Sequence, residues 1–305
     1  MMVTTSVGGD QQKIRLNELA AVVRRGHLPY VLSGALAVAS AAGAGLSLWL
    51  PSMLTGVPAA NGNLRGTALI MILVGIPVLA AAMLLTRRGS ARGLVLWLGA
   101  LGYVAYQAVM FCFATPLNNL FLLYVAQLSL AGWSIVVLLR SIDLERFGDR
   151  LSPSMPVRRF ACIAFVIVIL NAAAWLMRII PAVLSEEPQS LLIGSGLLTN
   201  PVFVQDLAIW LPLFAVAAVA GYRRQPWGLL GIGAMLTMTV LECIGIATDQ
   251  WFGSAADPGS PISSATMTPV FAAMALTLAL PLAYFLREID GRWLAMLTTR
   301  NLSHS

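Results

Sequence analysis

Two long apolar segments, residues 93–114 and 117–139, are separated only by Thr115 and Pro116. Each segment is long enough to cross a bilayer core of about 30 Å as a helix that rises about 1.5 Å per residue. A connection this short requires two neighbouring helices that run in opposite directions. We therefore predict a membrane-spanning helical hairpin, and we expect the other helices to pack around it.

The composition agrees with a chain that is solvated by a bilayer. Hydrophobic residues make up 58% of the sequence and charged residues only 10%, whereas a soluble domain carries about 25% charged residues. The net charge of +6 is explained below by membrane topology, so we expect the lipid bilayer as a partner and no nucleic acid.

Eight apolar segments follow one another along the chain, and they predict an all-α fold: a polytopic transmembrane helix bundle of about eight spans. We expect a single bundle over residues 28–286, with polar tails at 1–27 and 287–305. Residues 13–25 suit either a surface helix or a charged tail, and whether the first span is cleaved stays open. The predicted spans are 28–54, 67–86, 93–114, 117–139, 160–184, 204–222, 227–251 and 266–286.

Basic residues alternate between successive loops. Lys and Arg number four in the N-terminal tail, three between spans 2 and 3, five between spans 4 and 5, two between spans 6 and 7, and three in the C-terminal tail. The other four loops contain only Arg65. Because positive loops stay in the cytosol, both termini are predicted to be cytosolic. Eighteen of the nineteen basic residues are Arg, a bias typical of GC-rich bacterial genomes, so we expect the bacterial inner (cytoplasmic) membrane.

Ionisable side chains inside the spans are the first candidates for function, because a charge in a bilayer is costly. All of them fall in the outer half by their distance along each helix, and polar residues near the hairpin turn fall there too. Arg178 and Glu242 lie at similar depth, so we expect them to form a pair. Asp206 and Asp249 sit nearer the outer surface, where reaching the interface is the simpler explanation. The candidate ligand-binding residues are Tyr103, Tyr106, Gln107, Asn118, Asn119, Arg178, Asp206 and Glu242.

Several kinds of chemistry are excluded by residue types. No Lys lies in a span, which excludes a retinal Schiff base, and both His residues lie outside the spans, which excludes His-ligated haem or metal. The three Cys residues have no metal-ligand spacing, so we read them as small apolar side chains. We expect no cofactor, no metal and no catalytic residues. An intramembrane enzyme is the least favoured class, because no nucleophile and base can be paired.

Four segments carry a resemblance to known sequences. They are LGALGYVAY at 98–106, NLFLLY at 119–124, TNPVFVQD at 199–206 and RQPWG at 224–228. Together they resemble a group of uncharacterised bacterial multi-pass integral membrane proteins. The resemblance implies the same helical fold and implies no activity.

Two functions from different classes remain. The first is binding or transport of a small molecule or lipid through a polar pocket in the outer half of the bundle. The second is a non-catalytic subunit that assembles with another membrane protein, in which the polar groups only hold helices together. The sequence leaves the ligand, the partner and the oligomeric state open. A pocket with unpaired polar groups favours the first function, and a closed, fully paired cluster favours the second.

The topology can be tested with alkaline phosphatase, a reporter that is active only outside the cytosol. Fusions after Asn119, Gly194 and Gly259 should be active, and a fusion after Arg150 should be silent. The loop charges place these four sites on opposite sides of the membrane. Activity at Arg150, or silence at Gly194, would contradict the predicted topology.

Overall fold

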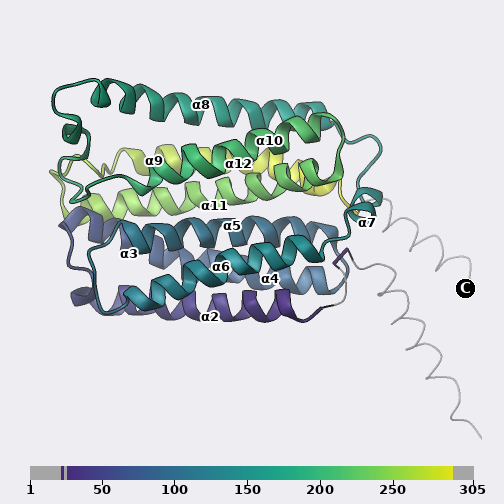
Figure 1. Ribbon diagram of the computed structural model, residues 1–305, viewed down its shortest axis with the longest axis horizontal. Coiled ribbons are helices and arrows are strands. Elements are labelled where there is room, and N and C mark those ends of the chain that lie inside the picture. The colour runs from purple at the N-terminus through teal and green to yellow at the C-terminus, as the bar shows by residue number, and fades with distance from the viewer. Residues whose placement is uncertain (1–21, 24–25, 291–305) are drawn as a thin grey trace, which may run out of the picture.

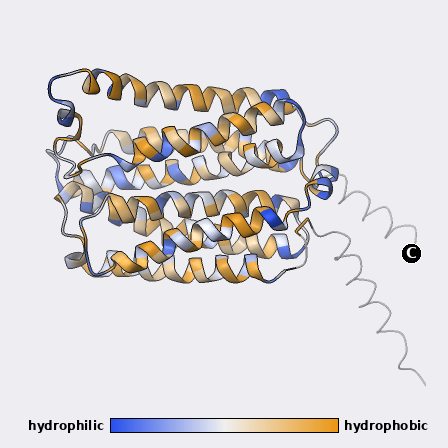
Figure 2. Cartoon of the chain, viewed as in Figure 1, coloured by the Kyte–Doolittle hydropathy of each residue, from blue (hydrophilic) through white to orange (hydrophobic). Residues whose placement is uncertain are grey.

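A computed structural model describes residues 22–23 and 26–290, and within them the chain is an all-α bundle (Figure 1). Eight helices in this part are long and apolar enough to cross a membrane, as predicted. Apolar residues cover the helices, and hydrophilic residues gather mainly at the two ends of the bundle (Figure 2). The spans are α2 (Leu28–Trp49), α3 to α4 (Pro58–Arg87), α5 (Ala91–Phe113), α6 (Phe121–Ser141), α8 (Val157–Val183), α9 to α10 (Pro201–Tyr222), α11 (Pro226–Ala256) and α12 (Met267–Arg287).

Several helix ends differ from the prediction. The first span ends at Trp49 and not at residue 54. The second span begins at Pro58 and not at Thr67, because the polar residues before Thr67 are also helical. Helix α11 continues to Ala256 and not to Trp251. The hairpin turn is longer than the sequence indicated, since α5 ends at Phe113 and α6 begins at Phe121. Apart from Val22 and Val23, the predicted surface helix at 13–25 lies outside the described residues.

The loops separate into two groups, as the alternation of charges predicted. At one end the backbone of Asp143 donates to Val22 and the backbone of Ser152 donates to Glu288, and Arg224 lines a cleft with Asp149. We call this the basic end. At the other end the closest neighbours of Gly56 include Pro116, and those of Gly194 include Pro261. We call this the hairpin end, because it contains the turn between α5 and α6.

Helices α5 and α11 form the centre of the bundle. They are the most enclosed of the eight spans in the described part of the chain, and α11 packs against α3, α5, α10 and α12. At Gly99 of α5, the space that a side chain would occupy is filled by Thr237 and the carbonyl oxygen of Ala234. The glycine therefore lets the two helices approach closely, as small residues do in membrane bundles.

Helices α2 and α6 are joined by small and polar residues. Ser33, Ser40, Gly43 and Ser47 lie on the buried face of α2. Gln127 of α6 donates a hydrogen bond of 2.8 Å to the carbonyl oxygen of Ala39. Small residues on this face let neighbouring helices approach closely.

Two spans each contain one wider, π-helical turn. The first is η2 (Met71–Gly75), between α3 (Pro58–Ile70) and α4 (Ile76–Arg87), and the second is η4 (Asp206–Trp210), between α9 (Pro201–Gln205) and α10 (Leu211–Tyr222). Pro77 and Pro212 each lie at the second position after a π turn. Proline has no N–H and its ring clashes with the preceding turn, and a wider turn relieves that clash. Each of these prolines is therefore accommodated by a π turn.

The basic end is held together by a buried ion pair. Arg150 Nη1, in the segment after α7 (Leu144–Asp149), lies 3.1 Å from Asp290 Oδ1. The second oxygen of Asp290 accepts hydrogen bonds from Ser90 Oγ and from the backbone N–H of Ala91, both at 3.0 Å. Asp290 thus satisfies free N–H groups at the start of α5. Burial lowers the pKa of Arg150 from its ordinary value, and the Asp290 carboxylate acts in the opposite direction.

Replacing Asp290→Ala should lower the free energy of unfolding by about 3–5 kcal/mol, because it leaves a buried guanidinium and uncapped backbone groups. Thermal or denaturant unfolding in detergent measures this loss. The exposed Arg223→Gln at the same end is the control and should change stability by no more than about 0.5 kcal/mol. Equal stability of the two variants would show that the ion pair does not hold the basic end.

Candidate functional site

The central helices meet at a buried hydrogen bond. Gln107 Nε2 of α5 donates to Glu242 Oε2 of α11 over 2.9 Å. The pair lies about two helical turns beyond the contact of Gly99 with Ala234, because both helices run in the same direction from the basic end. Close packing at the glycine therefore places the two polar side chains within reach of each other.

The other oxygen of Glu242 has no partner. Glu242 Oε1 is buried and accepts no hydrogen bond, and the hydroxyl of Tyr103 is also buried and unbonded. The Tyr103 hydroxyl lies within electrostatic reach of the carboxyl groups of Glu242 and Asp249. Its ring packs against Gly75 of η2, where an added Cβ would lie 2.7 Å from the ring. The first π turn therefore positions a hydroxyl that has no bonded partner near two carboxyl groups.

Asp249 lies nearer the hairpin end of α11 and is held by α3. Thr67 Oγ1 lies 3.0 Å and 3.1 Å from the two carboxyl oxygens of Asp249. Gly66, the residue before it, touches the backbone of Asp249: an added Cβ would lie 2.9 Å from Asp249 Cα. A glycine at this position is what allows α3 to approach α11 closely enough for the Thr67 bond.

Asp206 is the first residue of the second π turn and links α9 to two other helices. Trp175 Nε1 of α8 donates to Asp206 Oδ2 over 2.8 Å, and the Tyr106 side chain of α5 lies near this carboxyl. The Trp175 ring packs on Phe203 with a centroid distance of 5.0 Å. Trp175 thereby ties the peripheral helix α8 to Asp206.

We call these residues the carboxyl cluster: Glu242, Asp249 and Asp206, with Gln107, Tyr103, Tyr106, Thr67 and Trp175. Glu242 lies close enough to Asp249 and Asp206 for a charge on one carboxyl to affect the others. Among the described residues, no Arg or Lys forms an ion pair with any of the three carboxyls. The same part of the chain has no group of three or more His, Cys, Asp or Glu side chains placed to hold a metal ion. The cluster is therefore a buried group of carboxyls without cationic partners.

The structure brings together five of the eight predicted site residues and separates the other three. Tyr103, Tyr106, Gln107, Asp206 and Glu242 all belong to the cluster. The remaining residues of the prediction are Asn118, Asn119 and Arg178. Asn118 forms the hairpin turn, since its Oδ1 accepts from the backbone of Leu120 at 2.8 Å. Asn119 and Arg178 are exposed.

The predicted ion pair between Arg178 and Glu242 is wrong. Glu242 bonds to Gln107 instead, and no ion pair of Arg178 exists among the described residues. The buried residues of α8 all lie in its first two turns, up to Ala164. Further along, the helix lies at the edge of the bundle (Figure 1). Equal depth along two helices did not make their side chains neighbours.

Sequence reasoning missed four polar residues of this region. Thr67 was placed at a span boundary, and Asp249 was read as reaching the interface although Thr67 holds it in place. Trp175 and Gln205 lacked any ionisable group to mark them. Gln205 accepts from Trp210 Nε1 over 3.1 Å, while its Nε2 is buried and unbonded. The only available signal was proline: Pro77 and Pro212 mark the π turns beside the cluster.

Two clefts in the described structure lie away from the cluster. One is at the basic end, between the segment around Ser152 and the start of α11, and the other is at the hairpin end, between α3 and α11. Neither is lined by a residue of the carboxyl cluster. Gln107 is 4% exposed and Tyr103 is fully buried. The cluster is therefore enclosed in this conformation.

Comparisons with known proteins match no family model, no curated protein and no solved structure. The resemblance to bacterial multi-pass proteins stays an expectation from sequence. Function has to be argued from the geometry of the bundle alone.

A double-mutant cycle tests the central bond. Gln107→Leu removes the donor and leaves Glu242 without a hydrogen bond, which should cost about 1–3 kcal/mol. Combined with Glu242→Leu, the two changes should show a coupling free energy of at least about 0.5 kcal/mol in thermal or denaturant unfolding.

The matched control pairs Arg178→Gln with the same Glu242→Leu. Arg178 is exposed and does not reach Glu242, so these two changes should add within about 0.5 kcal/mol. Strong coupling to Arg178, or none to Gln107, would contradict this description of the site.

Proposed function

We propose that the protein is a proton-linked transporter of a small ligand, located in a bacterial cytoplasmic membrane with the basic end inward. The observation that carries the proposal is Glu242 Oε1, a buried carboxyl oxygen with no partner. It lies within electrostatic reach of two more carboxyls, the buried Asp206 and the half-buried Asp249. Proton binding at Glu242 is the step on which the proposal depends.

The physical reason is the cost of an unpaired charge inside a membrane. An ionised carboxylate in a dry site has to be paired, coordinated or neutralised. Glu242 receives one neutral hydrogen bond, from Gln107, and no ion pair. Protonation of Glu242 removes its charge. If the proton is on Oε1, that oxygen becomes a hydrogen-bond donor. Loss of that proton places a charge near Asp249 and Asp206, so the state of one carboxyl affects the others.

Tyr103 supports a route for protons between the carboxyls. Its hydroxyl forms no hydrogen bond and lies within electrostatic reach of the carboxyl groups of Glu242 and Asp249. A hydroxyl can donate and accept hydrogen bonds in turn. Asp249 lies nearer the hairpin end than Glu242, so the order Asp249, Tyr103, Glu242 leads inward from that end.

The two π turns support a conformational change at the same place. η2 packs against Tyr103 through Gly75, and η4 begins at Asp206. π turns inside helices are frequent at functional sites, and secondary transporters commonly bind ions where spanning helices are interrupted. Rearrangement of either turn would move a residue of the carboxyl cluster directly.

A role as a non-catalytic membrane subunit is the second candidate. The enclosure of the cluster favours it, because Tyr103 and Gln107 are sealed from both ends in this conformation. In that case the polar groups only join helices and Glu242 never exchanges its proton. The three unbonded atoms, on Glu242, Tyr103 and Gln205, favour the transporter.

Infrared difference spectroscopy of the protein in lipid distinguishes the two functions. On titration from about pH 5 to about pH 9, the transporter predicts a protonated-carboxyl C=O band that changes reversibly and is missing in Glu242→Gln. Glu187→Gln, an exposed loop residue, is the control and should leave that band unchanged. A spectrum in which Glu242→Gln removes no titrating band would overturn the proposal.

A further inference from the structure

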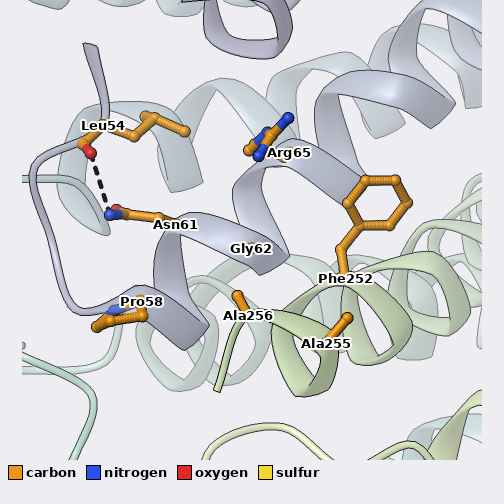
Figure 3. Close-up of a pocket in the computed structure, with 8 residues that line it drawn as sticks. All are labelled: Leu54, Pro58, Asn61, Gly62, Arg65, Phe252, Ala255 and Ala256. Carbon is orange, nitrogen blue, oxygen red and sulfur yellow. Dashed lines mark hydrogen bonds between the residues drawn. The ribbon is translucent and has the colours of Figure 1, made fainter. Parts of the chain in front are cut away.

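The cleft at the hairpin end has the features of a ligand site. Its volume is about 390 Å³, and it lies between the start of α3 and the end of α11 (Figure 3). The walls are mainly apolar, with Leu54, Pro58 and Phe252 among them, and the polar side chains are Asn61 and Arg65. Small-molecule sites are typically apolar clefts with a few polar groups that orient the ligand.

The cleft exists because α3 and α11 touch through their backbones. An added Cβ at Gly62 would lie 2.5 Å from the carbonyl oxygen of Phe252. Larger side chains are therefore excluded from this contact between the two helices. Ala255 and Ala256 of α11 also line the cleft, and their small side chains leave space in it (Figure 3).

Asn61 is occupied by a structural task. Its amide nitrogen donates to the carbonyl oxygens of Leu54 and Gly56, at 3.0 Å and 2.9 Å, and its oxygen accepts from the backbone of Gly56 at 3.1 Å. These bonds hold the segment that precedes α3. Asn61 shapes the cleft and has little remaining capacity to bind a ligand.

Arg65, in contrast, has no partner. It is the one charged residue in the lining of the cleft, its Nε is buried and unbonded, and no ion pair of Arg65 exists among the described residues. A guanidinium presents a planar set of donors that fits a carboxylate or phosphate. A buried donor without an acceptor is costly, and an anion in the cleft would supply that acceptor.

We propose that this cleft binds an organic anion, with the carboxylate or phosphate on Arg65 and the apolar part against Leu54, Pro58 and Phe252. The anion is either a free small molecule or a lipid headgroup, which share this chemistry. Binding stands on the cleft itself. Its role as the transported ligand rests on the proposed function, and it is supported by position: Gly66 and Thr67, which hold Asp249, directly follow Arg65.

Binding is measured on the full chain in nanodiscs of phosphatidylcholine, with naphthoate as the probe and the neutral naphthylmethanol for comparison. Naphthoate should raise the unfolding temperature to a saturating value, and the alcohol should not. Arg65→Gln should weaken naphthoate binding at least about tenfold, the loss expected for a hydrogen bond to a charged group. Arg178→Gln is the control. Arg178 is exposed, forms no ion pair among the described residues and does not line the cleft, so this variant should bind naphthoate as the parent does.

Two further arms complete the test. Nanodiscs that contain phosphatidylglycerol should weaken naphthoate binding if a headgroup is the natural occupant, and leave it unchanged if the anion comes from water; both results support the site. Ala255→Trp fills the cleft without removing the charge and should abolish binding, which covers the case that Arg65→Gln fails to fold. Absence of saturable naphthoate binding in phosphatidylcholine nanodiscs, or binding that Ala255→Trp leaves intact, overturns the inference. The infrared band of Glu242 is unaffected by this outcome, so the two proposals fail separately.

Discussion

The hydrogen bond between Gln107 and Glu242 is the interaction on which the rest of the site depends. It joins α5 and α11, the two most enclosed spans in the described structure. Close packing at Gly99 brings these helices near enough for the bond to form. The bond satisfies one carboxyl oxygen and leaves the other without a partner, in a region where an isolated charge is costly. The proposed transport function starts from this unpaired carboxyl oxygen.

The two ends of the bundle are built differently. At the basic end, Asp290 bonds to Arg150 and to the first N–H groups of α5, which fixes three segments together. At the hairpin end, the extended tips of α3 and α11 enclose a cleft with an unpaired arginine, Arg65. Two residues after Arg65 in α3, Thr67 bonds to Asp249. The basic end also has a cleft, around Ser152 and the start of α11, so the ends differ in the buried ion pair at one and in Arg65, which forms no ion pair among the described residues, at the other.

The features of this structure that could be predicted from the sequence are those that the bilayer imposes on residue type. Apolar length and the alternation of Arg between loops predicted the eight spans and the grouping of loops, because the bilayer imposes both. Asn200 caps α9 by accepting from the backbone of Val202, and Pro201 follows it, as is typical of helix starts. The polar extension of α3 before Thr67 was missed, because hydropathy measures contact with lipid and not helix formation.

The site was predicted in part for a related reason. Position along a helix gives the depth of a side chain, and depth correctly grouped Gln107, Asp206 and Glu242. It gives no information on which helices are neighbours. Arg178 has nearly the right depth for Glu242, but α8 packs mainly against α10 and lies at the edge of the bundle. Thr67 carries no charge, so nothing marked it as the partner of Asp249 until α3 and α11 were seen to touch.

In the proposed transporter, the carboxyl cluster is enclosed at rest and opens toward the hairpin end to exchange its proton. Thiol labelling of Gln107→Cys tests it, in a protein from which the three native cysteines have been removed. A membrane-impermeant reagent should react when it is added at the hairpin end, much more slowly than with the exposed Asn119→Cys, and it should not react from the basic end. Reaction from the basic end, or complete protection from both ends, would contradict this account.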